Sequence, residues 1–412
     1  TPDPESAPWS YVCPATPEWQ AFYGWRAVAL MGRHLADGEY LDIGPGLGRV
    51  HCEQEAHGHA PGWGTPVVSG VRAMLDARRD ELHALRGSFV PRGTEMMSEL
   101  YLDRFDFYQA RAGAGPLAML EGDKFRDGVK AGWAEKIPLF DFVYHDYGPV
   151  RLDGNLKLAP QLGGLFYWVA ARVVLDGALP ELNYELSALE RLPGMTGPTY
   201  FETYRPAYDC QDLTPYGSDP LRASFLRELS DLRTRRGRDF LVYGRMRKGP
   251  LFATAVPQVT LDWRLYNTFQ RAFTCDTGVE KGPEYFDSGL STVDAVLGSG
   301  WSAPFPPPPA ASPRHPVEQV GIALAEVGNA ARSPTLVLEP ARQGVALLNF
   351  RVTISRRGAD EDAGVLQAGA TLPVSLAAHE AVVVGVKPAP CSGPACRYRV
   401  YRAAAPQALY DD

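Results

Sequence analysis

YLDIGPGLGRVHCEQEAHGHAPGWG, residues 40–64, joins a short apolar run to a loop rich in glycine, proline and histidine. The apolar run is typical of a β-strand that ends at Asp42, because turn-forming residues follow it at once. A carboxylate at a strand end, followed by such a loop, suits a metal site, an active-site loop or an ordinary solvated connection. The rest of the chain has to distinguish these three interpretations.

The first half of the chain alternates short apolar runs with longer amphipathic stretches, which is the pattern of α/β proteins. Apolar runs predict strands at 39–44, 87–95 and 137–148. Helical spacing of apolar residues predicts helices over 19–35, 67–85, 162–179 and 220–236. The elements therefore follow the order βαβα.

Parallel strands joined by helices form either an open, doubly wound sheet or a closed (β/α)8-type barrel. No glycine-rich phosphate fingerprint follows the first strand, and candidate catalytic residues recur at the ends of successive strands, as in barrel enzymes. We therefore expect a barrel catalytic domain over residues 1–237. Because only four or five strand–helix units are recognisable, we expect this chain to hold the later strands of such a barrel and to lack the first ones.

The residue pattern of the second half of the chain is typical of β-strands. Alternating or β-branched runs such as PTLVLEP and ALLNFRVTIS, broken by turn residues, predict a C-terminal antiparallel β-sandwich over residues 238–412. Within it, the proline-rich segment 303–316, APFPPPPAASPRHP, predicts a stiff loop without chemistry of its own.

Composition excludes several classes of function. The 412 residues carry 45% hydrophobic residues and a net charge of -7, which is typical of a globular protein and argues against bulk electrostatic binding of nucleic acid or anionic lipid. No apolar run approaches the ~20 residues that a membrane span requires. We expect no nucleic-acid partner and no membrane span.

The six cysteines give one local pair and four scattered residues. Cys391 and Cys396 enclose the tight loop PCSGPAC and are expected to form a disulfide, with two free thiols as the alternative. A disulfide favours a secreted protein. The remaining four show no CxxC spacing, so we expect no structural zinc site; they are Cys13, Cys52, Cys210 and Cys275. We also expect no other metal and no cofactor.

Carboxylates follow two predicted strands, and a third carries a polar cluster. Asp42 ends the first strand, and Glu95 ends the second, with Glu99 four residues on. The third run contains Tyr144, His145 and Asp146 in VYHDYG. Two carboxylates at neighbouring strand ends suit glycosidic bond cleavage, in which one acts as nucleophile or base and the other protonates the leaving oxygen. Aromatic residues that could support sugar rings are Trp63, Tyr101, Tyr144, Tyr147 and Trp168.

Each candidate also has a structural explanation. An Asp at a strand end is often a turn or capping residue, and Glu95 with Glu99 could form one solvated helical face. His57 and His59 could bind a metal, but an HxH pair without a third ligand at a recognisable spacing is a weak signal, and loop hydrogen bonding explains it as well.

The order of several short motifs resembles a group of bacterial barrel glycoside hydrolases related to the endo-α-N-acetylgalactosaminidases. The motifs are CPATPEW, YLD, a cysteine followed by HGH and PGWG, the TE pair with a second Glu, and PLFDFVYHDYG. FLVYGRM and the ALAEVGNAARSPTLVLEP run resemble that group's last barrel helix and C-terminal sandwich. The resemblance covers most of the chain.

This resemblance implies a retaining mechanism in which Asp42 is the nucleophile and Glu95 the acid/base, with Glu99 as the alternative acid. It also implies that the family's chain begins well before Thr1, so an N-terminal fragment or second chain is expected to complete the barrel. Met96 and the IGPGLG turn after Asp42 depart from the family's pattern.

We therefore expect a glycoside hydrolase that cleaves an α-linked glycan, galactose- or N-acetylgalactosamine-like. The residues expected to hold sugar hydroxyls or rings are His57, His59, Trp63, Tyr144, His145 and Asp146. One alternative is a non-catalytic carbohydrate-binding or structural protein on the same scaffold. The other is a metal-dependent hydrolase that uses His57, His59 and Asp42.

Overall fold

The structure is a computed structural model. It describes residues 12–33, 36–41, 52–62, 64–95, 98–110, 139–152, 164–180, 220–266, 286–305 and 317–389. By its internal contacts the chain divides into two compact units. Unit 1 holds residues 1–111 and 147–151, and unit 2 holds residues 112–146 and 152–412. The predicted domain limits, 1–237 and 238–412, remain a prediction.

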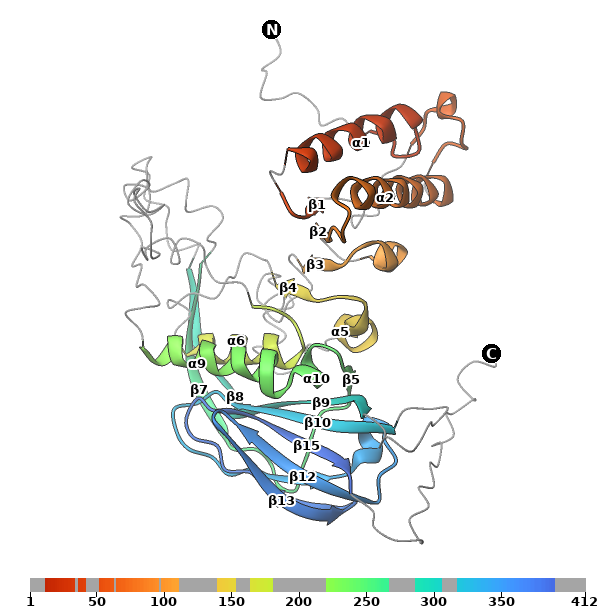
Figure 1. Cartoon of the computed structure of the whole chain (residues 1–412). Helices are drawn as coiled ribbons and strands as arrows, with labels where there is room; N and C mark the ends of the chain where they lie inside the picture. Colours follow the sequence, from red (N-terminus) through yellow and green to blue (C-terminus); the bar gives the residue numbers. More distant parts are fainter. Residues whose placement is uncertain are drawn as a thin grey trace, which may run out of the picture. The chain divides into compact units, whose positions relative to one another are not determined.

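Unit 1 contains a four-stranded sheet with the order β1-β2-β3-β4 (Figure 1). β1 and β2 are parallel, and so are β2 and β3. The strands are β1 (Glu39–Leu41), β2 (Arg92–Glu95), β3 (Phe107–Ala110) and β4 (Val150–Leu152). The parallel pairing confirms the α/β prediction for this part of the chain. The described residues contain no closed sheet, so the predicted barrel is not confirmed.

Two long helices accompany this sheet, and both were expected from their apolar spacing. α1 (Pro17–Gly32) and α2 (Thr65–Arg86) each begin with proline in the first turn, where the missing N–H costs nothing. The helices run side by side in the same direction, since Ala15 meets Gly70 near their starts and Met31 packs with Leu82 nearer their ends. Gly70 allows this approach, because a Cβ there would lie 2.6 Å from Cα of Ala15.

The run 137–148, expected to be a strand, is helical where it is described. Leu139–Tyr144 forms the short helix α5, and a 3-10 turn, η5, follows over His145–Tyr147. Phe, Val and Tyr have high strand propensity, but such preferences give way to the packing of a segment against its neighbours. The strand prediction for these residues is therefore wrong.

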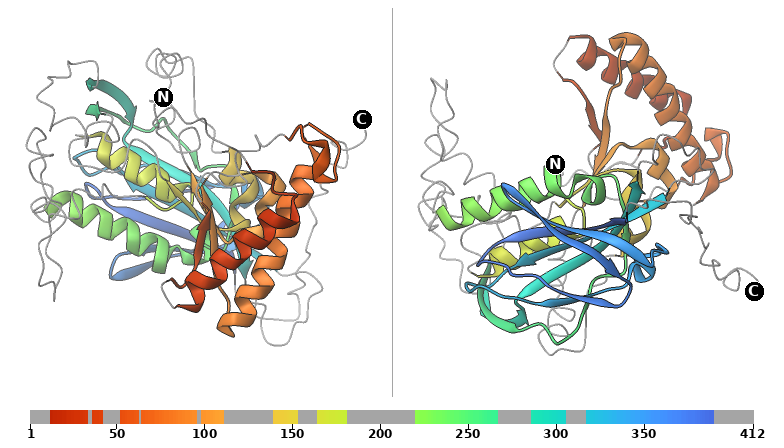
Figure 2. Two further views of the ribbon diagram at one scale, coloured as in Figure 1. Left: turned by 90° about the horizontal axis from the view of Figure 1, so that it is seen from above. Right: turned by 60° about the horizontal axis from the view of Figure 1, so that its bottom comes forward.

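The remaining helices of unit 2 pack against a large sheet. α6 (Leu165–Leu175) contacts α9 (Pro220–Asp231) and the strands β9 and β10, and Figure 2 shows α9 lying along the same sheet. The predicted helix 220–236 ends in a π-helical turn, η8 (Leu232–Arg236), followed by α10 (Arg238–Leu241). The run FLVYGRM, residues 240–246, has the β-rich character expected of the second half of the chain, but Phe240 and Leu241 belong to α10.

Two antiparallel sheets dominate the end of the described chain. The larger has the order β13-β12-β15-β10-β9-β5 and the smaller β14-β11-β6. One apolar cluster contains residues of both, including Ile322 and Val384 from the larger sheet and Leu336 from the smaller. This confirms the prediction of antiparallel sheets. The strands are β5 (Arg245–Arg247), β6 (Leu251–Phe252), β9 (Val296–Phe305), β10 (Val317–Glu326), β11 (Thr335–Leu338), β12 (Asn349–Arg356), β13 (Ala359–Gln367), β14 (Ala370–Pro373) and β15 (Ala381–Pro388).

β7 (Gln258–Tyr266) and β8 (Phe286–Asp294) form a separate antiparallel hairpin in unit 2.

The expected proline-rich loop begins later than predicted. Residues 303–305 belong to β9 and pair with β10. Residues 306–316 and the expected disulfide of Cys391 with Cys396 lie outside the described residues. No helix in the described ranges is both long and apolar enough to cross a membrane.

Candidate functional site

The ends of β1 and β2 meet at one edge of the parallel sheet. Leu41, the last residue of β1, pairs with Thr94, and Glu95 is the last residue of β2. The hydroxyl of Thr94 donates to the carbonyl oxygens of Leu41, at 3.2 Å, and of Glu95, at 3.1 Å, and so ties the two strand ends together. Glu95 itself is 2% exposed. This is the sheet edge where α/β enzymes place their catalytic groups.

The side chain of Glu95 belongs to the face of the sheet opposite α2. Side chains alternate along a strand, so Glu95 shares a face with Gly93 and with its register partner Gln109. The hydroxyl of Tyr40 donates to Oε1 of Gln109, which places Tyr40 on this face as well. The ring of Phe107 covers Gly93, where an added Cβ would come within 2.0 Å of it. Glu95 therefore shares this face of the sheet with Tyr40, Phe107 and Gln109.

On the other face of the sheet, the buried side chain of Arg92 joins the sheet to α2. Nε of Arg92 forms an ion pair with Glu39, and its Nη1 donates to the carbonyl oxygen of Leu75 in α2, at 2.6 Å. Its backbone N–H donates to Asp106, at 2.9 Å. These contacts fix α2 on that side of the sheet and leave the Glu95 face on the other.

The remaining carboxylate candidates differ in position. Glu99 is exposed at the start of the 3-10 helix η4 (Glu99–Arg104), four residues after Glu95. Asp42 follows Leu41 directly in the sequence but lies outside the described residues, as does Trp63. The separation of the Asp42 and Glu95 carboxyls is therefore a prediction.

The cluster VYHDYG belongs mainly to unit 2. His145 is 6% exposed, and its ring meets the ring of Trp301 edge to face, with centroids 4.8 Å apart. Gly177 lies against the same imidazole, since a Cβ there would come within 2.4 Å of it. Tyr144 is half-buried. The predicted contacts of Tyr144, His145 and Asp146 with sugar remain predictions.

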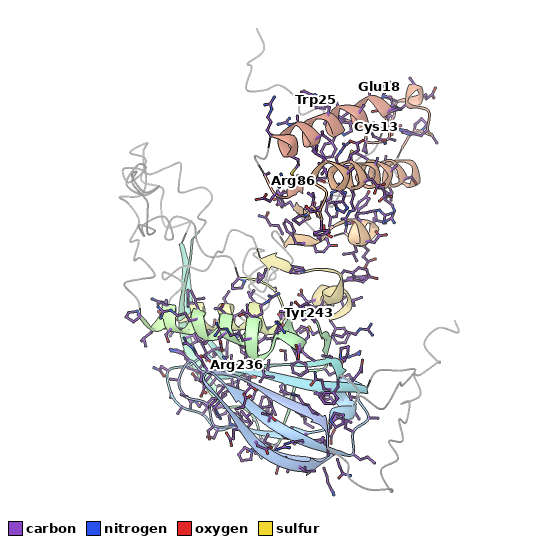
Figure 3. The ribbon with its side chains drawn as sticks, in the orientation of Figure 1. Cys13, Glu18, Trp25, Arg86, Arg236 and Tyr243 are labelled. Carbon is purple, nitrogen blue, oxygen red and sulfur yellow. The ribbon has the colours of Figure 1, made fainter. Side chains whose placement is uncertain are left out.

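A cluster of four potential metal ligands lies in unit 1. Sγ of Cys13 is 3.2 Å from Nε2 of His59, and Sγ of Cys52 is 3.1 Å from Nδ1 of His57. All four ligand atoms lie within 4.8 Å of one another. Both thiols are buried, and burial, more than the neighbouring Cys52, raises the pKa of the Cys13 thiol. Figure 3 labels Cys13, which precedes α1.

The chain holds these ligands with backbone hydrogen bonds. Cys52 and Gly62 form an antiparallel bridge, with N–H to O distances of 3.1 and 2.7 Å, that closes the loop carrying His57 and His59. Gly58 turns the chain between the two histidines with a φ of 74°, a conformation that glycine adopts without strain. The carbonyl oxygen of Cys13 accepts from the Thr16 backbone N–H, at 3.2 Å, in the turn that leads into α1.

Sequence spacing did not reveal the two cysteines of this cluster. Cys13 and Cys52 are far apart in the sequence and lack CxxC spacing, so only folding brings them together. The local pattern C-x4-H-x-H, from Cys52 to His59, offered a signal, because it places three ligands in eight residues. Its fourth member, Cys13, could not be found without the parallel packing of α1 on α2.

Comparison with known proteins gives one family match. Residues 5–151 match a family described as a domain of unknown function, DUF6259. The match covers just over a third of the chain and ends where the second segment of unit 1 ends. No curated protein matches the sequence.

The similar solved structures are glycoside hydrolases. A family GH27 β-L-arabinopyranosidase from Geobacillus stearothermophilus is 10% identical with a TM-score of 0.36, covering 91% of this chain and 62% of its own. An Anoxybacillus α-amylase is 9% identical with a TM-score of 0.39, covering 91% and 64%. A putative α-N-acetylgalactosaminidase from Bacillus halodurans is 10% identical with a TM-score of 0.25, covering 92% and 96%.

These similarities are weak. All three TM-scores lie below 0.5, so they carry no argument about activity or about which residues act. The chain also spans less than two thirds of the length of the first two structures. Any function must therefore be argued from the residues of this chain.

Proposed function

We propose that the protein is a retaining glycoside hydrolase that acts on an α-linked glycan, galactose- or N-acetylgalactosamine-like, with Asp42 as nucleophile and Glu95 as acid/base. One observation carries the proposal: β1 and β2 are adjacent, parallel and in register, and the chain leaves them at the same edge. Asp42 is the next residue after Leu41 in the sequence, and Glu95 ends the neighbouring strand on the face away from α2.

The chemistry needs two carboxyl groups with different duties. Asp42 attacks the anomeric carbon while Glu95 donates a proton to the glycosidic oxygen, so the bond to the leaving group breaks as a glycosyl-enzyme forms. Glu95 then takes a proton from water, which attacks the anomeric carbon and releases Asp42. Two inversions return the original configuration. A retaining enzyme needs the two carboxyls about 5–5.5 Å apart.

The surroundings of Glu95 support an acid/base role better than those of Glu99. Glu95 is almost completely buried and is the register partner of Gln109, so bulk water has little access to it during proton transfer. Glu99 is exposed on a 3-10 helix. We therefore assign the acid/base role to Glu95 and keep Glu99 as a control.

The test uses the full chain and aryl α-galactosides and N-acetyl-α-galactosaminides with good and poor leaving groups. Glu95→Gln should lower kcat/KM by about 10²–10⁴-fold for a poor leaving group, which needs the proton, and much less for dinitrophenolate, which does not. Glu99→Gln should change either rate less than twofold. Asp42→Asn should abolish turnover of both substrates.

Azide gives an independent check of the roles. Azide should restore turnover of the good substrate by Glu95→Ala and yield the glycosyl azide with retained configuration, because the glycosyl-enzyme still forms. Equal losses in Glu95→Gln and Glu99→Gln, or the same loss for both leaving groups, would refute the assignment. Glycan binding without turnover in the unmodified protein would instead indicate a carbohydrate-binding protein.

A further inference from the structure

We propose that Cys13, Cys52, His57 and His59 bind one zinc ion in a structural site that ties the segment before α1 to the loop before α2. The spacing of the cysteines predicted no structural zinc site. It does not depend on the proposed glycosidase activity, because neither Asp42 nor Glu95 takes part in it.

The geometry matches a tetrahedral ion. With bonds of about 2.3 Å to sulfur and about 2.0–2.1 Å to nitrogen, a zinc ion keeps its four ligand atoms about 3.3–3.8 Å apart. In the structure the four atoms lie within 4.8 Å of one another, and two sulfur–nitrogen separations are 3.2 and 3.1 Å. Small shifts of the side chains would bring all four atoms to one centre.

The ligand types select zinc. Two thiolates and two imidazoles form a Cys2His2 set, which zinc binds in structural sites, whereas calcium and magnesium require oxygen ligands. With four protein ligands the coordination shell is complete and leaves no position for a water molecule or substrate. The proposed ion therefore stabilises the fold. Because it occupies His57 and His59, these histidines are not available to the catalytic metal of a hydrolase that would use them with Asp42.

A hydrogen bond behind His59 favours its binding to a metal ion. Nδ1–H of His59 donates to the carbonyl oxygen of Ala60, at 2.8 Å. This contact fixes the proton on Nδ1 and leaves the lone pair of Nε2 directed at the Cys13 sulfur. A histidine ligand of zinc commonly donates its other N–H to a backbone carbonyl in this way.

The loop contributes little apolar surface to a core. Residues 53–56, 60 and 61 are exposed, and the loop between Cys52 and Gly62 offers no apolar side chain to a core. One apolar cluster near the ends of the two helices contains Met31, Leu82 and Val90. A metal ion can stabilise a loop that contributes few apolar contacts, because its binding free energy counts as folding free energy.

The experiment measures metal in the full chain. The protein is produced with zinc supplied, purified with a reducing agent, and analysed by elemental mass spectrometry; one zinc per chain is expected. After removal of zinc, cobalt(II) should give the intense visible bands of a tetrahedral site and a thiolate charge-transfer band in the near ultraviolet. Chelation should lower Tm by at least about 5 °C.

Variants locate the ion. Cys13→Ser and His59→Asn should each lose zinc, whereas His83→Asn, in α2 of the same unit and outside the cluster, should retain it. If a variant fails to fold, the cobalt spectrum of the unmodified protein still decides, because only a site with thiolate ligands gives the charge-transfer band.

Three results would overturn the proposal. The first is unmodified protein with reduced thiols that binds neither zinc nor cobalt. The second is an intact mass two hydrogens lower, with a Cys13–Cys52 cross-linked peptide, which would show a disulfide in place of the site. The third is zinc retained by both ligand variants, which would place the ion elsewhere.

Discussion

The imidazole of His379 lies flat on the phenol ring of Tyr167, with ring centroids 3.7 Å apart and planes 2° apart. The stack joins helix α6 to the turn before β15. The backbone N–H of His379 donates to Oε2 of the buried Glu326, at 2.8 Å. His379 also has a φ of 57°, the left-handed region that few side chains adopt. Ring stacking and a backbone hydrogen bond to a carboxylate hold this turn in place.

This stack makes the stability of the protein depend on pH. Burial lowers the pKa of His379 below its ordinary value of 6.5, so around and below that pH the unfolded chain binds more protons than the folded one. The contribution of His379 is complete above about pH 6.5 and is lost as the pH falls through its folded pKa. Urea unfolding at about pH 5.5 and about pH 7.5 should give a larger difference in ΔG for the unmodified protein than for His379→Asn, which tolerates the same backbone conformation. Equal differences would contradict this.

Arg236 should be intolerant of substitution by lysine. Its side chain is 8% exposed, and its guanidinium donates to Glu228 at 2.7 Å, to Asp231 at 2.6 Å and to the carbonyl oxygen of Ala381 at 2.6 Å (Figure 3). An ammonium group cannot make this planar set of contacts. Arg236→Lys should lower the free energy of unfolding by about 2–4 kcal/mol in urea titrations.

The neighbouring residue supplies the matched control for Arg236. Arg235 is 82% exposed and pairs with Asp231 at 3.7 Å. Arg235→Lys should change the free energy of unfolding by less than about 0.5 kcal/mol. A similar loss for the two variants would mean that the contacts of Arg236 are not what stabilises this junction.

Gly93→Ala should destabilise the parallel sheet. The new methyl group would lie 2.0–2.6 Å from atoms of the Phe107 ring, and relieving that overlap should cost about 1–3 kcal/mol. Adding Phe107→Leu should recover part of the loss, because a smaller side chain leaves room for the methyl group. Gly32→Ala in α1, whose Cβ would meet only Leu85 at 3.9 Å, should be neutral or stabilising. Additive effects of Gly93→Ala and Phe107→Leu would exclude direct contact.

Local patterns predicted the long elements well. The helices α1, α2 and α6 follow apolar spacing over at least three turns, and the parallel pairing of β1 with β2 follows from the intervening helix. The segment 139–147 was mispredicted because its aromatic and β-branched residues are those of a strand, while packing within unit 2 makes it helical. The prediction of a closed barrel rested on polar residues at strand ends. Their placement does not determine how many strands a sheet contains.

The candidate sites differ in how far sequence could reveal them. Glu95 was found because a carboxylate after an apolar run is a local signal. The cluster of Cys13 with His59 was missed because it joins residues 46 positions apart, and its geometry depends on the close approach of Ala15 to Gly70. A site whose residues are brought together only by tertiary packing cannot be recognised from the spacing of those residues in the sequence.

The interleaving of the two units sets an order on synthesis. β4 belongs to the sheet of unit 1, yet residues 112–146, which belong to unit 2, emerge from the ribosome before it. The nascent sheet must therefore wait with the outer edge of β3 uncovered while a segment of the other unit is translated. A pause in translation once residue 152 has left the ribosome would allow β4 to cover that edge before the β-rich half emerges, and a premature stop before residue 147 would leave the edge exposed to aggregation.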